Sequence, residues 1–151
     1  MKDRKINIFL ADDDEDDRGF FQEAIITLNV NSDLKMVDNG DKAIKYFKTT
    51  KMMPDFIFLD INMPFKNGFE CLRSIKELYP ANAYHTIILS TSIAEKDINL
   101  SYELGASAYI QKPGSFLDLI KYLDHCLNKL DFSIKREDFL LNIQNIQKIR
   151  T

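Results

Sequence analysis

The sequence predicts an α/β fold of the doubly wound (βα)5 type, in which five parallel strands alternate with five helices. Five short apolar runs occur between residues 6 and 111, and each is followed by a segment whose apolar residues recur at helical spacing. Some runs, such as residues 56–59, are apolar at every position, which is typical of strands covered on both faces. Short connections favour right-handed crossovers, so we expect one parallel sheet with helices on both faces.

Length and composition indicate one globular domain with a substantial core. The 151 residues are 45% hydrophobic and 28% charged, and the net charge of -3 argues against nucleic acid as a direct partner. Neither an apolar signal region nor a run of about 18 apolar residues occurs, so we expect a cytoplasmic protein with no membrane partner. Cys71 and Cys126 fit buried core thiols better than a disulfide or a zinc site.

The first strand is predicted at residues 6–11, and residues 12–17 after it are all acidic. Residues 14–17 suit the start of a helix, because acidic side chains favour the positive end of a helix dipole. Asp12 and Asp13, however, leave the strand before a helix can turn. The helix that follows has an apolar side made of Phe21, Ala24, Ile25 and Leu28.

The next two strands are predicted at residues 34–37 and 56–59. An Asp38-Asn39-Gly40 turn follows the second strand, and Pro80 ends the helix after the third. The inward residues of the second helix are Ala43, Ile44 and Phe47. Those of the third helix are Phe69, Leu72, Ile75 and Leu78.

Residues 86–89 and 108–111 are the fourth and fifth predicted strands. Ser92-Ile93-Ala94-Glu95 has the spacing of a capping box that begins a fourth helix, and Gly105 ends this helix. Ser115 to Asp118 fits another helix cap. The buried stripe of the fifth helix is then Phe116, Leu119, Ile120, Leu123, Leu127 and Leu130.

Acidic side chains follow the first and third strands, which we expect to be neighbours about 4.8 Å apart. Asp12, Asp13 and Asp60 would then share a pocket at the carboxyl edge of the sheet, where open α/β sheets bind ligands. Mg2+ prefers such oxygen ligands and relieves their repulsion. Ser90 and Lys112 add donors at the same edge, so the pocket suits a phosphoryl group that a nucleophilic Asp60 attacks.

These residues and their spacing resemble the receiver domains of two-component response regulators, over residues 6 to about 130. The acidic pair, Asp60 in Leu-Asp-Ile-Asn-Met-Pro, Gly68, a hydroxyl after the fourth strand and Lys112-Pro113 occur in the family's order. One such motif is weak, but the whole set is specific. The resemblance implies a flavodoxin-like sheet with strand order 2-1-3-4-5, a receiver at 1–130 and a C-terminal extension at 131–151.

The resemblance also implies a role for each site residue. Asp60 is the phosphoacceptor and a ligand of Mg2+ (or Mn2+), while Asp13 binds the metal directly and Asp12 largely through water. The backbone carbonyl of Asn62 completes the protein's share of the metal site. Lys112 pairs with the phosphoryl group.

Two further positions match the family's switch. Ser90 fits the switch hydroxyl when the sequence is aligned without gaps through Gly105 and Lys112, and Thr91 is the competing assignment. Tyr109 fits the switch aromatic, which turns inward when the hydroxyl approaches the phosphate.

Several of these residues also have plainer interpretations. Lys112 could be a solvated lysine at a strand end, although Pro113 favours the site. Tyr109 could be an ordinary core residue, and Asn62 could serve only as a turn former. His85 and His125 fall away from the strand exits.

The resemblance implies a response regulator that receives phosphate from a sensor histidine kinase or a phosphotransfer protein. Its fourth helix, fifth strand and fifth helix would bind a downstream protein or a second copy of the chain. Residues 131–151 are too few for a helix-turn-helix domain, so direct nucleic-acid binding is not expected. They could hold one helix with Phe139, Ile143, Ile146 and Ile149 on one side.

Two other functions compete with this one. The first is a Mg2+-dependent phosphohydrolase of the haloacid dehalogenase type, which also uses an aspartyl nucleophile. That class requires a second acid at the position of Asn62. The second is a degenerate receiver that binds a partner without phosphate, but no expected site residue is missing. We therefore expect a phosphoacceptor rather than an enzyme.

Overall fold

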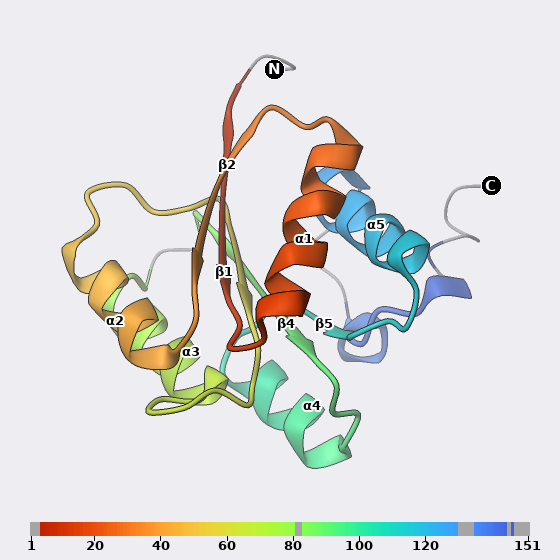
Figure 1. Ribbon diagram of the computed structural model, residues 1–151. Coiled ribbons are helices and arrows are strands. Elements are labelled where there is room, and N and C mark those ends of the chain that lie inside the picture. Colours follow the sequence, from red (N-terminus) through yellow and green to blue (C-terminus); the bar gives the residue numbers. More distant parts are fainter. Residues whose placement is uncertain (1–3, 81–82, 130–134, 145, 147–151) are drawn as a thin grey trace.

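The structure, a computed structural model, describes residues 4–80, 83–129, 135–144 and 146. Five parallel strands form one sheet in the order β2-β1-β3-β4-β5, which confirms the predicted fold class and strand order (Figure 1). The strands are β1 (Ile6–Ala11), β2 (Ser32–Val37), β3 (Phe56–Leu59), β4 (His85–Ser90) and β5 (Ala108–Gln111).

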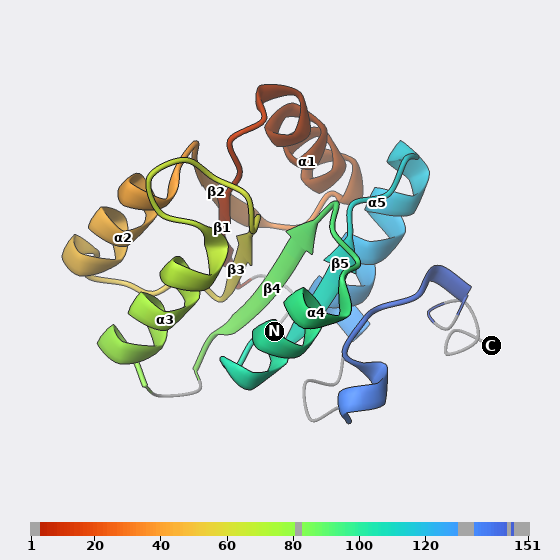
Figure 2. The ribbon, with the colours of Figure 1, turned by 90° about the horizontal axis from the view of Figure 1, so that it is seen from below.

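Helices cover both faces of the sheet. In Figure 2, α2, α3 and α4 lie on one side of the sheet, and α1 and α5 lie on the other. The helices are α1 (Glu15–Leu28), α2 (Gly40–Thr49), α3 (Gly68–Leu78), α4 (Glu95–Glu103) and α5 (Phe116–Asp124). Each has an apolar stripe that it buries against the sheet.

The sheet therefore separates two hydrophobic cores. Ile8 and Leu10 of β1 face the core that includes α1 and α5, while Phe9 and Ala11 face the core under α2 and α3. This alternation follows from the period of two in a strand. Both cysteines are free and buried, as predicted.

The start of α4 differs from the predicted capping box. Ala94 is the N-cap, and no side chain caps the first turn there. The Ser92 hydroxyl instead donates to the Asp97 carboxylate at 2.7 Å and accepts from the Ala94 amide at 3.1 Å. The capping-box prediction was wrong because Ser92 forms a side-chain turn before the helix begins.

The fifth helix continues beyond α5 as a π-helical turn, η1 (His125–Lys129). Leu127 is buried on this turn, as predicted, whereas Phe116 at the start of the predicted stripe is exposed. Leu130, the last residue of that stripe, lies outside the described residues, and so does Ile149 of the proposed final helix.

Residues 135–144 pack on the edge of β5. A short 3-10 turn, η2 (Arg136–Asp138), leads to an isolated parallel bridge between Tyr109 and Leu140. The Tyr109 amide donates to the Phe139 carbonyl at 3.0 Å, and the Leu141 amide donates to the Tyr109 carbonyl at 2.9 Å. This segment therefore extends the sheet at a single position rather than forming one continuous helix through residues 135–144.

None of the helices in the described part of the chain combines the length and apolar character that crossing a membrane requires.

Candidate functional site

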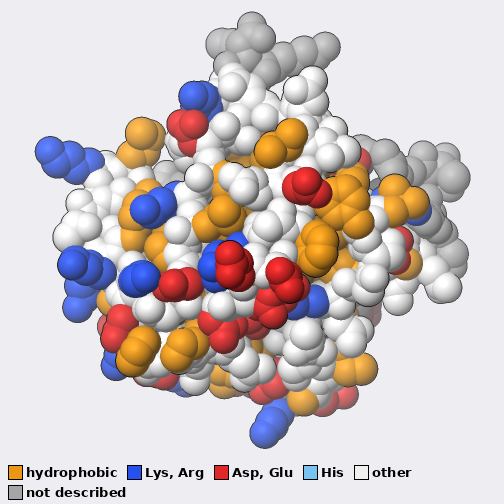
Figure 3. Space-filling view, in the orientation of Figure 1, with side chains coloured by type: hydrophobic (Ala, Val, Ile, Leu, Met, Phe, Trp, Pro, Cys, Tyr) orange, Lys and Arg blue, Asp and Glu red, His pale blue; other side chains and the backbone are white. Residues whose placement is uncertain are grey.

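Three carboxylates meet at the carboxyl ends of β1 and β3. The two strands are paired, and the Asp60 amide donates to the Ala11 carbonyl at 3.0 Å, so the residues after them leave side by side. One carboxylate oxygen from each of Asp12, Asp13 and Asp60 lies within 4.8 Å of the others. Acidic side chains gather around the start of α1 in the space-filling view (Figure 3).

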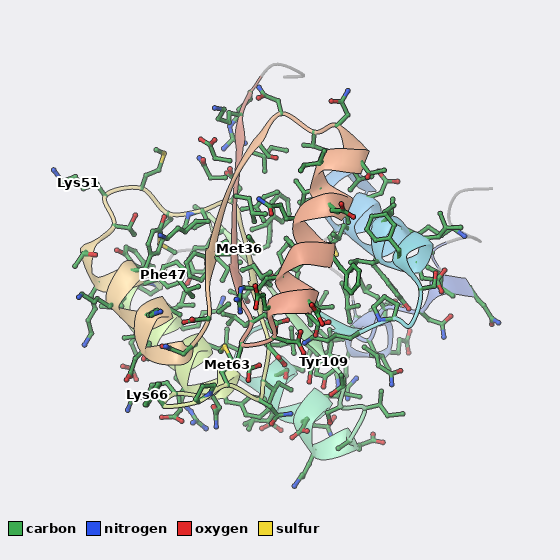
Figure 4. All side chains as sticks on the ribbon, viewed as in Figure 1. Met36, Phe47, Lys51, Met63, Lys66 and Tyr109 are labelled. Carbon is green, nitrogen blue, oxygen red and sulfur yellow. The ribbon has the colours of Figure 1, made fainter. Side chains whose placement is uncertain are left out.

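Close backbone packing holds Asp60 in place. Gly68 begins α3 directly against the end of β3, and its amide donates to the Ile61 carbonyl at 2.8 Å. A Cβ atom at Gly68 would lie 2.3 Å from the Asp60 carbonyl oxygen, so any larger residue forces the backbone apart. Met63 and Lys66 lie on the loop between β3 and α3 (Figure 4). Gly68 is thus needed here for close approach.

Asp12 is buried and attached to the start of α1. Its carboxylate accepts from the Asp14 amide at 3.0 Å, and its carbonyl accepts from the Arg18 guanidinium at 2.9 Å. The Asp14 side chain in turn caps the helix by accepting from the Asp17 amide at 3.0 Å. Asp13 is exposed beside them. The first turn of α1 is therefore fixed relative to the pocket.

Burial makes Asp12 and Asp60 hold protons more tightly than usual. Desolvation raises the pKa of Asp60 to about 6; Lys112 lowers it and Asp12 raises it. Desolvation also raises the pKa of Asp12, although hydrogen bonds from Lys112 and Asp14 oppose the rise. The pKa is raised for both carboxyl groups, so the positive charge of Lys112 does not fully compensate for their burial.

Lys112 reaches this cluster from the end of β5. Its amide donates to the Ser90 carbonyl at 2.8 Å, which ties the loop after β5 to β4. Its ammonium lies 2.9 Å from Asp12, 3.1 Å from Asp60 and 2.8 Å from Asp17, and its side chain is 13% exposed. Burial alone would lower the pKa of Lys112, but hydrogen bonds to Asp17 and Asp12 and the charge on Asp60 raise it above its usual value.

Asp17 is a member of the site that the sequence interpretation missed, because residues 14–17 were assigned together to a solvated helix start. A usable signal was present. Asp17, Phe21, Ala24 and Leu28 are spaced by four, three and four residues, which places Asp17 on the buried side of α1. An acid on an inward stripe requires a partner, and Lys112 supplies it.

Ser90 is the last residue of β4, and its side chain is fully buried, while Thr91 is exposed. The Ser90 hydroxyl accepts from the Ser92 amide at 3.2 Å. Tyr109 is also fully buried, and its hydroxyl donates to the Ser92 carbonyl at 2.7 Å. Figure 4 places Tyr109 at the end of the sheet nearest α4. Ser90 and Tyr109 thus both bond to the segment between β4 and α4.

The remaining candidates lie at different depths. Asn62 is exposed after β3, and its backbone amide bonds to the Asp60 carboxylate and thereby opposes the rise in its pKa. His85 begins β4 at the opposite end of that strand, and His125 is buried after α5. Neither histidine belongs to the carboxylate cluster.

The donor set fits a hard divalent cation. Three carboxylates converge, and the raised pKa values of Asp12 and Asp60 show that added positive charge would be favourable. The Lys112 ammonium donates a hydrogen bond of 3.1 Å to one oxygen of the Asp60 carboxylate. A phosphoryl group carries anionic oxygens that such a cation and such an ammonium can both neutralise.

A family model for the response regulator receiver domain matches residues 8–124. Response regulator Rcp1 of Synechocystis sp. is 30% identical over 119 residues, which are 76% of this chain and 81% of Rcp1. A protein-glutamate methylesterase/protein-glutamine glutaminase of Archaeoglobus fulgidus is 28% identical over 89% of this chain. The match covers 39% of that longer enzyme, so its activity does not transfer to this chain.

Solved structures agree with the sequence comparison. The phosphorylated cyanobacterial phytochrome response regulator RcpA is 31% identical, with a TM-score of 0.76 over 85% of this chain and 98% of RcpA. The Mn2+-bound form of Rcp1 is 27% identical, with a TM-score of 0.74 over 83% of this chain and 97% of Rcp1. Both similar structures thus carry, by their descriptions, either a phosphoryl group or a divalent metal.

Proposed function

The chain belongs to the response regulator receiver domain family, and from this premise we propose that it accepts a phosphoryl group on Asp60 and signals by protein-protein interaction. One observation carries the proposal. Asp60 is buried at a strand end between a cluster of carboxylates and the Lys112 ammonium, an arrangement of coupled charges that is typical of a reactive site. The phosphodonor is a sensor histidine kinase or a phosphotransfer protein.

The metal of the proposed reaction is Mg2+, or Mn2+ in its place. Asp13 and Asp60 would bind it directly, Asp12 largely through water, and the Asn62 carbonyl would complete the protein's share. The convergence of the three carboxylates supports this assignment. When bound, the cation neutralises the phosphoryl oxygens and the charge on the carboxylates.

The chain's own residues carry the transfer. A carboxylate oxygen of Asp60 attacks phosphorus, the bond from phosphorus to the donor's imidazole nitrogen breaks, and that nitrogen keeps the electron pair. Lys112 donates to a phosphoryl oxygen that would otherwise be left uncompensated. Attack by water on phosphorus later releases inorganic phosphate and restores the carboxylate. In each cycle Asp60 is phosphorylated and then restored by hydrolysis. The protein is therefore the phosphoacceptor of the reaction and does not turn over a separate substrate.

The output in this proposal is the surface of α4, β5 and α5, controlled by Ser90 and Tyr109. The phosphoryl group would attract the Ser90 hydroxyl, which now accepts from Ser92 at 3.2 Å, and the Tyr109 hydroxyl bonds to the same segment. Movement of the Ser90 hydroxyl would then favour a different packing of the Tyr109 side chain. Residues 1–130 act as the receiver, and residues 131–151 act as an extension that modifies this surface.

A surface for the phosphodonor lies beside the site. A cavity of about 180 Å³ is lined by Asp17, Lys112, Phe20 and Phe116, among other residues of α1 and the loop before α5. The side chains of Phe20 and Phe116 are 53% and 40% exposed. Exposed aromatic side chains next to a reactive group support docking of another protein there.

Incubation with acetyl phosphate and Mg2+, followed by intact mass measurement, tests the proposal. We expect one added phosphoryl group on the native protein and none on Asp60→Asn. Asp41→Asn, which changes an exposed acid in α2, is the matched control and should react like the native protein. Equal labelling of Asp60→Asn would overturn the proposal, and sustained hydrolysis of many phosphomonoesters would favour the phosphohydrolase instead.

A further inference from the structure

The Lys112 ammonium is held by one carboxylate more than the proposed phosphoacceptor site requires. Its nitrogen forms ion pairs with Asp12, Asp60 and Asp17, at 2.9, 3.1 and 2.8 Å, and donates hydrogen bonds to Asp60 and Asp17. Asp17 comes from α1, and its side chain is 37% exposed. A lysine with three ion pairs and a side chain that is 13% exposed has few alternative positions.

Asp17 differs from the other two partners in what else its carboxylate does. Asp12 and Asp60 belong to the group of described carboxylates that converge closely enough to share a cation, and Asp17 is not in that group. A cation would draw on the oxygens of Asp12 and Asp60, and phosphorylation would convert the Asp60 carboxylate into an acyl phosphate. Asp17 is therefore the partner that Lys112 keeps when the pocket is filled.

The position of Asp17 is itself well fixed. The Asp17 amide donates to the Asp14 side chain at 3.0 Å, and Arg18 donates to the Asp12 carbonyl at 2.9 Å. These bonds lock the first turn of α1 to the end of β1. The Asp17 carboxylate thus approaches Lys112 from a helical turn that is fixed at the end of β1.

We propose that Asp17 is a positioning residue, which holds the Lys112 ammonium over the pocket throughout phosphoryl transfer. Lysine has a long side chain with four rotatable bonds, and ordering it costs free energy each time it must meet the phosphoryl group. A permanent partner removes that cost in advance. This inference rests on the proposed function, because it assigns Asp17 a part in the reaction of Asp60.

The test compares Asp17→Asn with Asp16→Asn. Asp16 is exposed in the same helical turn, and the two changes remove the same charge from adjacent positions. We expect Asp17→Asn to lower the rate of phosphorylation by acetyl phosphate about three- to tenfold at saturating Mg2+, the effect of losing one partly exposed ion pair. Asp16→Asn should stay within about twofold of the native rate.

A second readout reports on the lysine directly. Nuclear magnetic resonance of the Lys112 ammonium should show slow proton exchange with water in the native protein and in Asp16→Asn. In Asp17→Asn one proton loses its charged acceptor, so we expect faster exchange and a shifted 15N resonance. Beryllofluoride with Mg2+ should slow exchange in the native protein, and this protection should be weaker in Asp17→Asn.

The reaction rates and the ammonium exchange together decide whether Asp17 positions Lys112. Native rate and native ammonium exchange in Asp17→Asn would overturn the inference, as would equal slowing by Asp16→Asn, which would indicate a general charge effect. A slower reaction with unchanged Lys112 exchange would also overturn it, since Asp17 would then act by another route. If the native protein gains no phosphoryl group, the proposed function fails, and the ammonium exchange still shows whether Asp17 holds Lys112.

Discussion

The carboxylate pocket and the part of the C-terminal extension that packs on β5, residues 135–144, affect the stability of the fold in opposite directions. The pocket gathers Asp12, Asp13 and Asp60, and burial opposes the ionisation of Asp12 and Asp60. The extension buries Phe139 completely against the rings of Tyr102 and Tyr109, with centroids 5.2 and 6.4 Å away. The first region lowers the stability of the fold in return for reactivity, and the second raises stability. Mutations in the two regions should therefore change stability in opposite directions.

The largest effect is expected from Phe139→Ala. Removing a fully buried phenylalanine side chain costs about 3 to 5 kcal/mol, because apolar contacts are lost and a cavity remains. The free energy of unfolding, measured with urea, should fall by about this amount. Phosphorylation by acetyl phosphate should continue, since Phe139 is not part of the carboxylate pocket.

Phe20→Ala is the matched control for that change, because the same side chain is removed from an exposed position on α1. Its stability should stay within about 0.5 kcal/mol of the native value. If Phe139→Ala also cost this little, residues 135–144 would not contribute to the stability of the fold, and the contrast between the two regions would be wrong.

Asp60→Asn should act in the opposite direction and stabilise the metal-free protein above about pH 6. The pKa of Asp60 is raised from 3.8 to about 6, so the folded state binds a proton more tightly than the unfolded state. Its contribution to stability is therefore present below about pH 4 and is lost as pH rises through about 6. At pH 8 we expect Asp60→Asn to be more stable by about 1 to 3 kcal/mol.

Urea unfolding between pH 4 and 8 with a chelator present measures this difference. The native curve should fall relative to that of Asp60→Asn as pH rises, while Asp41→Asn should follow the native curve. Parallel curves for the native protein and Asp60→Asn would show that the pocket carries no buried charge penalty.

The smallest effect is expected from Arg136→Ala. The Arg136 guanidinium lies over the rings of Tyr102 and Phe139, 5.5 and 5.9 Å from their centroids, and it bonds to Asn99. Cation-π contacts at such partly exposed sites contribute about 0.5 to 1 kcal/mol. The same urea measurement should detect this loss, and Lys96→Ala on the exposed side of α4 should show none. A loss as large as that of Phe139→Ala would mean that the charge, rather than the buried ring, holds the extension.

Local sequence patterns predicted most of the fold. The burial of residues 57–59 and the spacing of Phe21, Ala24 and Ile25 reflect strand and helix periods that the chain carries without reference to distant parts. The convergence of Asp12 and Asp60 could also be foreseen, because the carboxyl ends of neighbouring parallel strands meet at one edge.

Two of the features that escaped prediction depend on contacts between distant segments. The pairing of Asp17 with Lys112 joins residues 95 positions apart, and it depends on the rotational phase of α1 relative to β5. The bridge from Leu140 to Tyr109 depends on where the chain returns after α5. Periodicity shows which side of an element is buried, but it does not show which distant residue lies against that side.

The bridge at Tyr109 also covers part of one edge of the sheet. β2 and β5 are the two edge strands of the sheet, and open strand edges are templates for pairing with other chains. The amide and carbonyl of Tyr109 are both occupied by Phe139 and Leu141. A chain shortened to residue 130 would leave these groups unpaired beside an uncovered aromatic surface. It would be prone to aggregate through β5, even though every residue of the carboxylate pocket would still be present.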